Sequence, residues 1–242
     1  MKTTVLVVGG TGRTGARVLQ QLADAGVNVR AIVRSRAKVS PAIAESPRVT
    51  LIEADLLSLS DEALRDAVTG CDAILSCLGH VMSVRGVLGP PFDLVTRAVR
   101  RLCEAVEALK PETPVKVVVM TSVSVNHPDL PEPARSGTQR ALLWVLRGLV
   151  PPARDNQAVA DFLSARIGSA HAYVQWVVVR PDTLLAGDVS AYTPHEKLVS
   201  SLFAPEQSRM ANVAHFMCSL VTDAALWETW RGKCPVVVDR KG

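Results

Sequence analysis

The feature that most constrains the fold of this chain is a glycine-rich turn near its amino terminus. Gly9, Gly12 and Gly15 have the spacing G-x-x-G-x-x-G. In a strand–turn–helix unit, the first glycine of such a trio permits a tight turn. The second lets a pyrophosphate approach the backbone, and the third lets the helix pack closely on the strand. The helix N-terminus then offers free N–H groups to the phosphates. The turn residues expected to contact a dinucleotide are Gly9, Thr11, Gly12, Arg13, Thr14 and Gly15.

The segments on both sides of the turn are those that a dinucleotide site requires. The apolar run Thr3–Val8 precedes the turn, the amphipathic stretch Thr14–Ala25 follows it, and a second apolar run occupies Val27–Val33. A glycine trio can also form a tight turn that binds no ligand. Because the strand, the helix and the second strand are all present, the sequence favours dinucleotide binding over that alternative.

The same alternation of apolar runs and amphipathic stretches continues as far as Pro181. Strands joined by right-handed helical crossovers form parallel sheets. We therefore expect an α/β fold, a Rossmann-type doubly wound parallel sheet, in a single domain. The parts at about 123–172 and 183–242 are expected to lie over the carboxyl edge, on the substrate side. The expected strands are 3–8, 27–33, 48–53, 73–77, 115–120, 174–179 and 235–239, and the expected helices are 14–25, 61–69, 92–109, 138–148, 155–167 and 212–223.

The composition excludes several classes of protein. A net charge of +4, from 27 basic and 23 acidic residues, is too small for a nucleic-acid-binding surface. No apolar run reaches the roughly 18 residues of a membrane span, and residues 1–8 have the pattern of a strand rather than of a signal peptide. The five cysteines include no C-x-x-C pair, and His171, His195 and His215 have no ligand spacing, so no metal site is expected. These features fit a cytoplasmic protein.

The end of the second expected strand indicates which dinucleotide is preferred. NAD-binding sites of this type place Asp or Glu there, on the ribose hydroxyls. This chain has Arg34 and Arg36 instead, and no acid between residues 30 and 38. A guanidinium can pair bidentately with the 2′-phosphate of NADP. We therefore expect NADP(H), bound mainly by Arg34 and secondly by Arg36, with Arg13 on the adenine or the phosphate. Asp55 is expected beside the adenine amino group, or as a helix cap.

Further motifs mark the ends of the expected strands, and together they resemble those of an atypical short-chain dehydrogenase/reductase. The chain is most similar to the NAD(P)-binding subgroup that includes NmrA-like proteins and biliverdin reductase B, a flavin reductase. The resemblance covers about residues 1–225. Besides the glycine turn and Arg34, the motifs that carry it are Ala54-Asp55-Leu56, Cys77-Leu78-Gly79, Met120-Thr121-Ser122, Arg154-Asp155, Val179-Arg180-Pro181 and Asn212-Val213-Ala214.

The resemblance implies that a cofactor lies across the carboxyl edge of the sheet. Leu78 and Gly79 would then pass the ribose and the nicotinamide, and Thr121 would lie near the nicotinamide ring. Cys77 could face the cofactor or fill the core as a small buried residue. The residues expected to contact the cofactor beyond the glycine turn are Arg34, Arg36, Asp55, Leu56, Cys77, Leu78, Gly79, Thr121 and Pro181.

The usual proton donor of short-chain dehydrogenases is missing. Most of these enzymes have a Tyr-x-x-x-Lys pair on one helix, in which the lysine lowers the pKa of the tyrosine. This chain has only Tyr173 and Tyr192, and neither has lysine four residues later. Ser122, at the position of the family serine, and His80, beside Gly79, are the candidate catalytic residues.

Asp155 and His127 are weaker candidates for a proton step. Each fits a simpler interpretation, Asp155 as a helix-start or loop residue and His127 as part of a polar turn before Pro128.

Two functions stay open at this point. One is an NADPH-dependent reductase of a small organic substrate, in which the cofactor carries the hard chemistry and the proton comes from water. The other is an NmrA-like regulatory protein that senses NADP(H) without turnover. An isomerase or epimerase is disfavoured, because such enzymes of this superfamily keep the Tyr–Lys pair. The apolar stretch Thr138–Val150 could be a lid, a subunit contact or a buried helix, which leaves a homodimer or a protein partner open.

Overall fold

The computed structural model describes residues 3–80, 89–127, 136–139, 141–142, 144, 150–201 and 204–240. Within them, strands and helices alternate as the sequence predicts. The strands are β1 (Thr4–Val8), β2 (Asn28–Val33), β3 (Val49–Glu53), β4 (Ala73–Ser76), β5 (Val115–Met120), β6 (Val174–Pro181), β7 (Thr183–Leu185), β8 (Tyr192–His195), β9 (Gln207–Arg209) and β10 (Val236–Asp239). The helices are α1 (Arg13–Asp24), η1 (Arg36–Lys38), α2 (Pro41–Ala44), α3 (Asp61–Val68), α5 (Leu94–Leu109), α7 (Pro151–Phe162) with the π-helical turn η2 (Leu163–Ile167), α8 (Met210–Thr222) and α9 (Ala224–Trp230).

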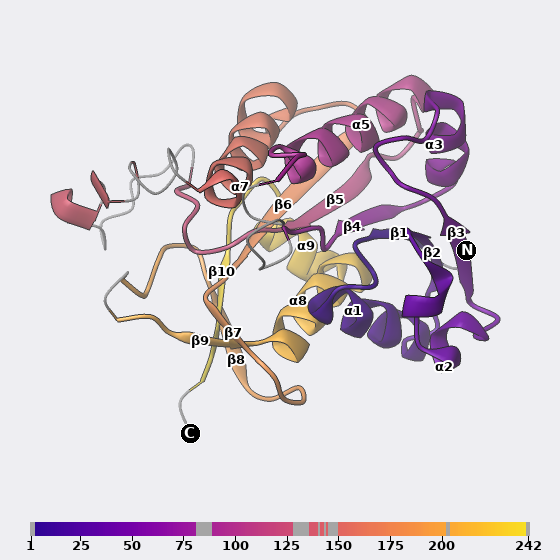
Figure 1. Cartoon of the computed structure of the whole chain (residues 1–242). Helices are drawn as coiled ribbons and strands as arrows, with labels where there is room; N and C mark the ends of the chain where they lie inside the picture. Colours follow the sequence, from indigo (N-terminus) through magenta and orange to yellow (C-terminus); the bar gives the residue numbers. More distant parts are fainter. Residues whose placement is uncertain are drawn as a thin grey trace.

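Eight strands form the central sheet in the order β3-β2-β1-β4-β5-β6-β10-β8 (Figure 1). β1 pairs in parallel with both β2 and β4, so the chain reverses its direction of travel across the sheet beside β1. Open α/β sheets bind ligands at such a switch point, outside the carboxyl ends of the strands. The strand order confirms the predicted Rossmann-type fold. The one departure from a parallel sheet is β8, which runs antiparallel to β10 at the edge.

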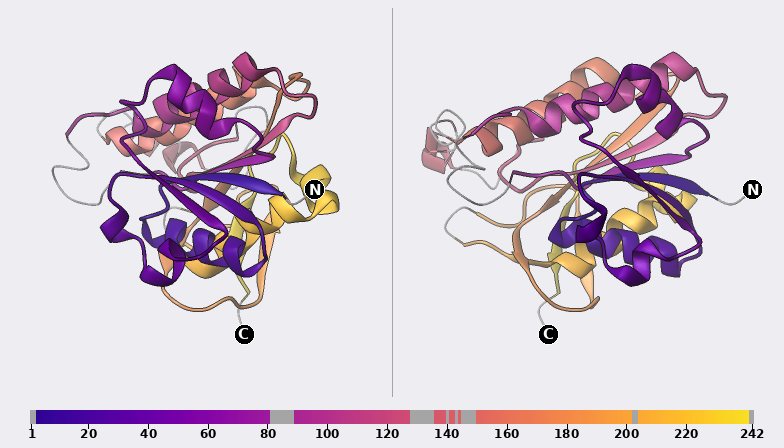
Figure 2. Two further views of the ribbon diagram at one scale, coloured as in Figure 1. Left: turned by 90° about the vertical axis from the view of Figure 1, so that its right-hand side faces the viewer. Right: turned by 45° about the vertical axis from the view of Figure 1, so that its right-hand side comes forward.

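Helices cover both faces of the sheet (Figure 2). α3, α5 and α7 lie on one face, and α1, α8 and α9 lie on the other. Two buried hydrophobic clusters fill the space between these layers and the strands, and each draws on alternate residues of the same strands. Val117 and Val119 of β5 point into one cluster, and Val118 points into the other. Burial on both faces explains why the strands have unbroken runs of valine rather than a polar alternation.

The start of α7 differs from the sequence expectation. The sequence predicts a helix over 155–167, whereas α7 starts four residues earlier, at Pro151. Pro151 and Pro152 occupy the first turn of α7. Proline is well suited to that turn, because the first N–H groups of a helix need no partner within the helix. This places Asp155 inside the helix, where it is buried. The helix expected at 138–148 lies mostly outside the described residues.

Much of the carboxyl-terminal part is built into the main body. β10 lies at the expected strand 235–239. It pairs in parallel with β6 and extends the sheet. α8 packs beside α1, where Cys218 Sγ lies 3.8 Å from the carbonyl oxygen of Val18. β7 and β9 form a separate two-stranded parallel pair. Sequence analysis missed this pair because strands of three residues show no clear period.

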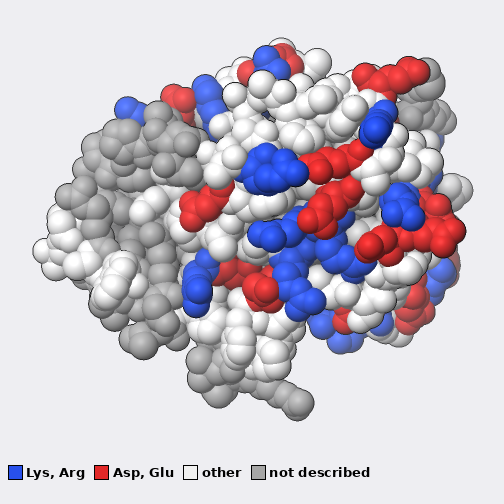
Figure 3. All heavy atoms as spheres, turned by 90° about the horizontal axis from the view of Figure 1, so that it is seen from above, with Lys and Arg blue, Asp and Glu red and all other residues white. Residues whose placement is uncertain are grey.

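The surface over α3, α5 and α7 has a mixed charge. Figure 3 shows basic and acidic side chains side by side on this face. Of the helices in the described residues, none combines the length and the apolar character needed to cross a membrane.

Candidate functional site

The glycine turn packs directly on the chain that leaves β4. Gly9 has a φ of +77°, and a Cβ placed there would lie 2.6 Å from the carbonyl carbon of Cys77. A Cβ on Gly15 would lie 2.1 Å from the carbonyl oxygen of Gly9. Both distances are far below a van der Waals contact, so these two positions require glycine. The turn therefore brings the start of α1 next to the carboxyl end of β4.

The N-terminus of α1 is free to accept a ligand. Within the described chain, no side chain caps this helix, and its first turn carries no acidic residue. By contrast, Ser60 Oγ accepts a hydrogen bond from Ala63 N of α3 at 3.1 Å, and Asp223 caps α9. Uncapped N–H groups and the helix dipole form an anion-binding site. Gly12 is exposed at this end of the helix, so the backbone is open to the approach of an anion.

Three arginines are candidates for binding the cofactor phosphates, and two of them have side chains without a bonding partner among the described residues. Arg13 and Arg34 are exposed, and neither side chain forms an ion pair or hydrogen bond with another described residue. Arg36 behaves differently: its Nη2 donates to the Leu51 carbonyl oxygen at 2.6 Å, and its Nε lies 3.8 Å from Glu53 Oε2. The structure therefore leaves Arg34 available for an added phosphate and holds Arg36 against β3.

The loop after β3 is held by hydrogen bonds from Arg101, a residue far from it in the sequence. Arg101 of α5 donates to the carbonyl oxygens of Leu56 at 2.8 Å and Leu59 at 2.6 Å, and pairs with Asp61 Oδ1 at 2.8 Å. Asp55 Oδ1 accepts a hydrogen bond from Leu57 N at 2.9 Å, so this exposed carboxylate shapes its own turn. Leu56 is buried. Sequence analysis missed Arg101 because it lies about 45 residues away from the loop.

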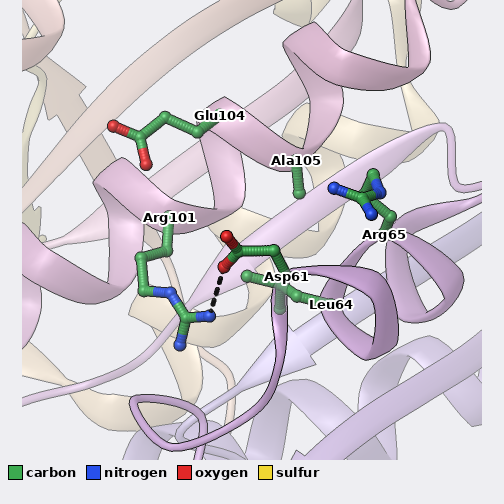
Figure 4. Close-up of a pocket in the computed structure, with 6 residues that line it drawn as sticks. All are labelled: Asp61, Leu64, Arg65, Arg101, Glu104 and Ala105. Atoms are coloured by element: carbon green, nitrogen blue, oxygen red, sulfur yellow. Dashed lines mark hydrogen bonds and ion pairs between the residues drawn. The ribbon is translucent and has the colours of Figure 1, made fainter.

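Arg101 also borders a small cavity of about 80 Å³ between α3 and α5 (Figure 4). The other lining residues are Asp61, Leu64, Arg65, Glu104 and Ala105. Arg101 points toward Asp61, with which it forms the ion pair. The cavity lies beside α3 and α5, away from the glycine turn, and it is far smaller than the 300 Å³ or so of a typical ligand pocket. Of its lining residues, Arg101 bonds to the loop after β3.

The carboxyl ends of β4, β5 and β6 bring the remaining predicted residues to one edge. Leu78 is half-buried and Gly79 is exposed as the chain leaves β4. Thr121 is buried, and its N–H donates to the Val179 carbonyl oxygen at 2.8 Å. Ser122 Oγ lies 2.7 Å from Ser124 Oγ. Pro181, the last residue of β6, is buried.

His80 and Asp155 form a buried pair at this edge. His80 Nε2 lies 2.9 Å from Asp155 Oδ2, and the two side chains are 4% and 0% exposed. Asp155 also accepts hydrogen bonds from Val95 N at 2.7 Å and from Thr96 N at 3.0 Å and Thr96 Oγ1 at 2.6 Å. One carboxylate on α7 thus caps α5 and fixes a histidine that follows β4. The sequence singled out both residues, but 75 positions separate them and their pairing was not predicted.

α7 also holds the loop that follows β5. Gln157 Oε1 accepts from Asn126 N at 2.8 Å, and Gln157 Nε2 donates to the Asn126 carbonyl oxygen at 3.3 Å. His127 in the same loop is buried. The first turns of α7 therefore set the position of the chain after β5 and, through Asp155, of the histidine after β4.

Two polar residues in the motifs of the resemblance have structural roles. Arg180 is fully buried, and its Nε donates to the Cys234 carbonyl oxygen at 2.6 Å. Asn212 is fully buried as well. Its Nδ2 donates to Asp239 Oδ1 at 2.7 Å, and its Oδ1 accepts from Ser190 N at 2.8 Å. Arg180 and Asn212 therefore hold the carboxyl-terminal segments to the main sheet.

The cysteines are poor candidates for chemistry. All five are buried, and none forms a disulfide. Burial raises the pKa of Cys77 to about 12 and that of Cys71 to about 11. The thiolate is the reactive form, so we expect no thiol of the native protein to react with Ellman's reagent at pH 8, and all five to react in denaturant. A native thiol that reacts within minutes would contradict the burial described here.

The comparisons with known proteins agree with this geometry. The sequence model of the NAD(P)H-binding family matches residues 9–224. No curated protein matches the sequence. Among solved structures, a protein from Lactobacillus casei is similar over 99% of this chain and 100% of its own, with a TM-score of 0.72 and 18% identity.

Two further solved structures have described activities. A candidate NADH-flavin reductase from Streptococcus pneumoniae matches with a TM-score of 0.68 and 16% identity, over 98% of this chain and 100% of its own. The anaerobillin reductase ChuY from Escherichia coli matches with a TM-score of 0.68 and 16% identity, over 99% of this chain and 98% of its own. At these identities the likeness shows a shared fold.

Proposed function

The chain belongs to the NAD(P)H-binding family, and on that premise we propose that it is an NADPH-dependent reductase of a small organic substrate. The observation that carries the proposal is the uncapped α1 N-terminus, packed by Gly9 and Gly15 against the chain that leaves β4. When bound, the cofactor would supply a hydride. The solved flavin reductase candidate and the anaerobillin reductase share this fold. An isomerase is disfavoured because neither Tyr173 nor Tyr192 has lysine four residues later.

The residues present fit NADPH along the whole carboxyl edge. The N–H groups at the start of α1 would hold the pyrophosphate. Arg34, with Arg13 beside the turn, would hold the 2′-phosphate. The loop at Asp55 and Leu56 would border the adenine, while Gly79 and Thr121 would border the nicotinamide. We also propose that the protein acts in the cytoplasm.

The preference for NADPH over NADH rests on Arg34. A free, exposed guanidinium can make a charge-assisted bond to the 2′-phosphate, and no such group exists on NADH. The Arg34→Ala variant is expected to bind NADPH more weakly by about 1–3 kcal/mol, roughly 5- to 150-fold, with NADH affinity unchanged. Fluorescence titration of both cofactors measures this.

A matched control for this prediction is Arg166→Ala. Arg166 is exposed at 64% and lies 3.8 Å from Glu107, on the segment that precedes β6. Its removal lowers the net charge by the same amount and should leave both affinities unchanged. If Arg34→Ala weakens NADPH and NADH equally, Arg34 does not contact the 2′-phosphate.

Turnover separates the reductase from the alternative regulatory role. NADPH oxidation is followed at 340 nm with aldehydes, ketones, quinones and flavins as acceptors. Oxidation that depends on one of these acceptors supports the proposal. Tight NADPH binding with no oxidation on any acceptor would favour an NmrA-like sensor.

A further inference from the structure

Neither the binding of a cofactor nor the capping of α5 requires the buried contact between His80 and Asp155. Each Asp155 oxygen already accepts hydrogen bonds from α5: Oδ2 accepts from Val95 N, and Oδ1 accepts from Thr96 N and Thr96 Oγ1. These bonds satisfy the helix end without the histidine. His80 Nε2 is an additional partner at 2.9 Å.

The geometry defines which nitrogen of His80 can exchange a proton. A carboxylate bonded to three donors of α5 acts only as an acceptor, so His80 must donate to it from Nε2–H. Nδ1 is then the nitrogen that gains and loses a proton. Among the described residues, no group forms a hydrogen bond with Nδ1. A histidine oriented by a carboxylate in this way is the arrangement that general acids and bases use.

The pair lies at the edge where the nicotinamide is proposed to bind. His80 is the third residue after Cys77, whose carbonyl group is nearest to the position of a Cβ on Gly9. Asp155 comes from α7, whose Gln157 holds the loop after β5. The side chain of His80 is 4% exposed, so bulk water reaches little of it. A proton needed at this point of the edge would come from the imidazole rather than directly from solvent.

We propose that His80 is the proton donor of this reductase and that Asp155 is its positioning residue. The inference rests on the proposed function. In the step, a hydride from NADPH forms a C–H bond at a carbonyl carbon, the C=O π bond breaks, and the oxygen takes the proton from Nδ1–H of the His80 imidazolium. The products are an alcohol, NADP⁺ and neutral His80, which regains its proton from water through the small exposed part of its side chain.

This assignment selects a substrate class. The oxygen of a reduced ketone or aldehyde is strongly basic, and it needs a proton as the hydride arrives. A flavin or quinone spreads the added charge over its rings, and can take its proton later from water. The pair therefore favours a carbonyl acceptor, and it has no role in the reduction of a flavin.

The test compares His80→Gln with wild type on a ketone or aldehyde and on a flavin. The variant is expected to lose about 100-fold or more in kcat with the carbonyl acceptor, and to keep its NADPH affinity and any flavin turnover. The loss should be confined to the carbonyl acceptor, because the flavin needs no proton from His80. His171→Gln is the matched control, because His171 Nε2 also pairs with a carboxylate, Glu107 Oε1 at 3.2 Å, before β6.

Imidazole NMR gives a readout that needs no turnover. In ¹⁵N-labelled wild-type protein, neutral His80 is expected as the Nε2–H tautomer. In Asp155→Asn this preference should weaken while His171 keeps its signals.

An Nδ1–H tautomer in wild type would overturn the proposal even if no variant folds. Equal kcat values for His80→Gln and wild type with the carbonyl acceptor would also overturn it, as would a wild type that reduces only flavins or quinones. If wild type fails to oxidise NADPH with every acceptor tested, the proposed function is overturned, and the proton role of His80 is overturned with it.

Discussion

The Gly15→Ala variant is expected to lose about 3 kcal/mol of folding free energy and about 100-fold in NADPH affinity. A Cβ at Gly15 would lie 2.1 Å from the Gly9 carbonyl oxygen, and 2.9 Å from the carbonyl carbon of the same residue. Both are backbone atoms, so no side-chain rotation can relieve the contact. The start of α1 must move away from β1, and the N–H groups that would hold the pyrophosphate move with it. Urea unfolding and fluorescence titration measure the two losses.

Gly137→Ala is the control for this prediction. A Cβ at Gly137 meets no atom within 4 Å, and its φ is not in the left-handed region. The same chemical change should therefore alter stability by less than about 0.5 kcal/mol and leave NADPH affinity unchanged. Wild-type affinity in Gly15→Ala would show that the α1 N-terminus does not hold the cofactor.

The Asp155→Ala variant is expected to be less stable than wild type by about 3–5 kcal/mol, the largest loss of stability that we predict. The change removes the acceptor of Val95 N, Thr96 N and Thr96 Oγ1, and it leaves His80 buried without its partner. The side chain of Asp155 is fully buried, so water cannot replace these bonds without opening the structure. Thermal and urea unfolding at pH 7 measure the effect.

Asp161→Ala is the matched control on the same helix. Asp161 is exposed, and its Oδ1 accepts a single hydrogen bond from Gln157 Nε2 at 2.8 Å. Its loss should cost less than about 1 kcal/mol. If the two aspartate variants are equally stable, Asp155 does not cap α5 in solution.

The cofactor end of the fold could be predicted because its signals are local. Glycine spacing, an apolar run before it and an amphipathic stretch after it lie within about 33 residues, and each has a direct physical meaning. The main strands were predictable for a similar reason. A parallel strand covered on both faces needs an unbroken apolar run, as in Val115–Met120.

The parts that could not be predicted depend on contacts between distant residues. Asp155 fits a helix start in the sequence, and only the packing of α7 on α5 shows that it caps another helix and fixes His80. Arg36 has the same sequence signal as Arg34, yet its guanidinium bonds to the backbone of β3. Pro151 and Pro152 suggest an interruption between two helices when only the sequence is considered. In the structure they occupy the first turn of α7, where proline stabilises a helix.

Helix α5 determines how independently the two ends of the proposed site can move. Its first turn is bonded to Asp155, which fixes His80, and Arg101 in the same helix fixes the loop that carries Asp55 and Leu56. Arg101 follows Val95 by six residues, a rise of about 9 Å along the helix axis. One rigid element thus sets the separation between the histidine and the adenine-side loop. Both ends are already ordered before a ligand arrives, so binding costs little conformational entropy there, and affinity depends on contacts rather than on a prior rearrangement.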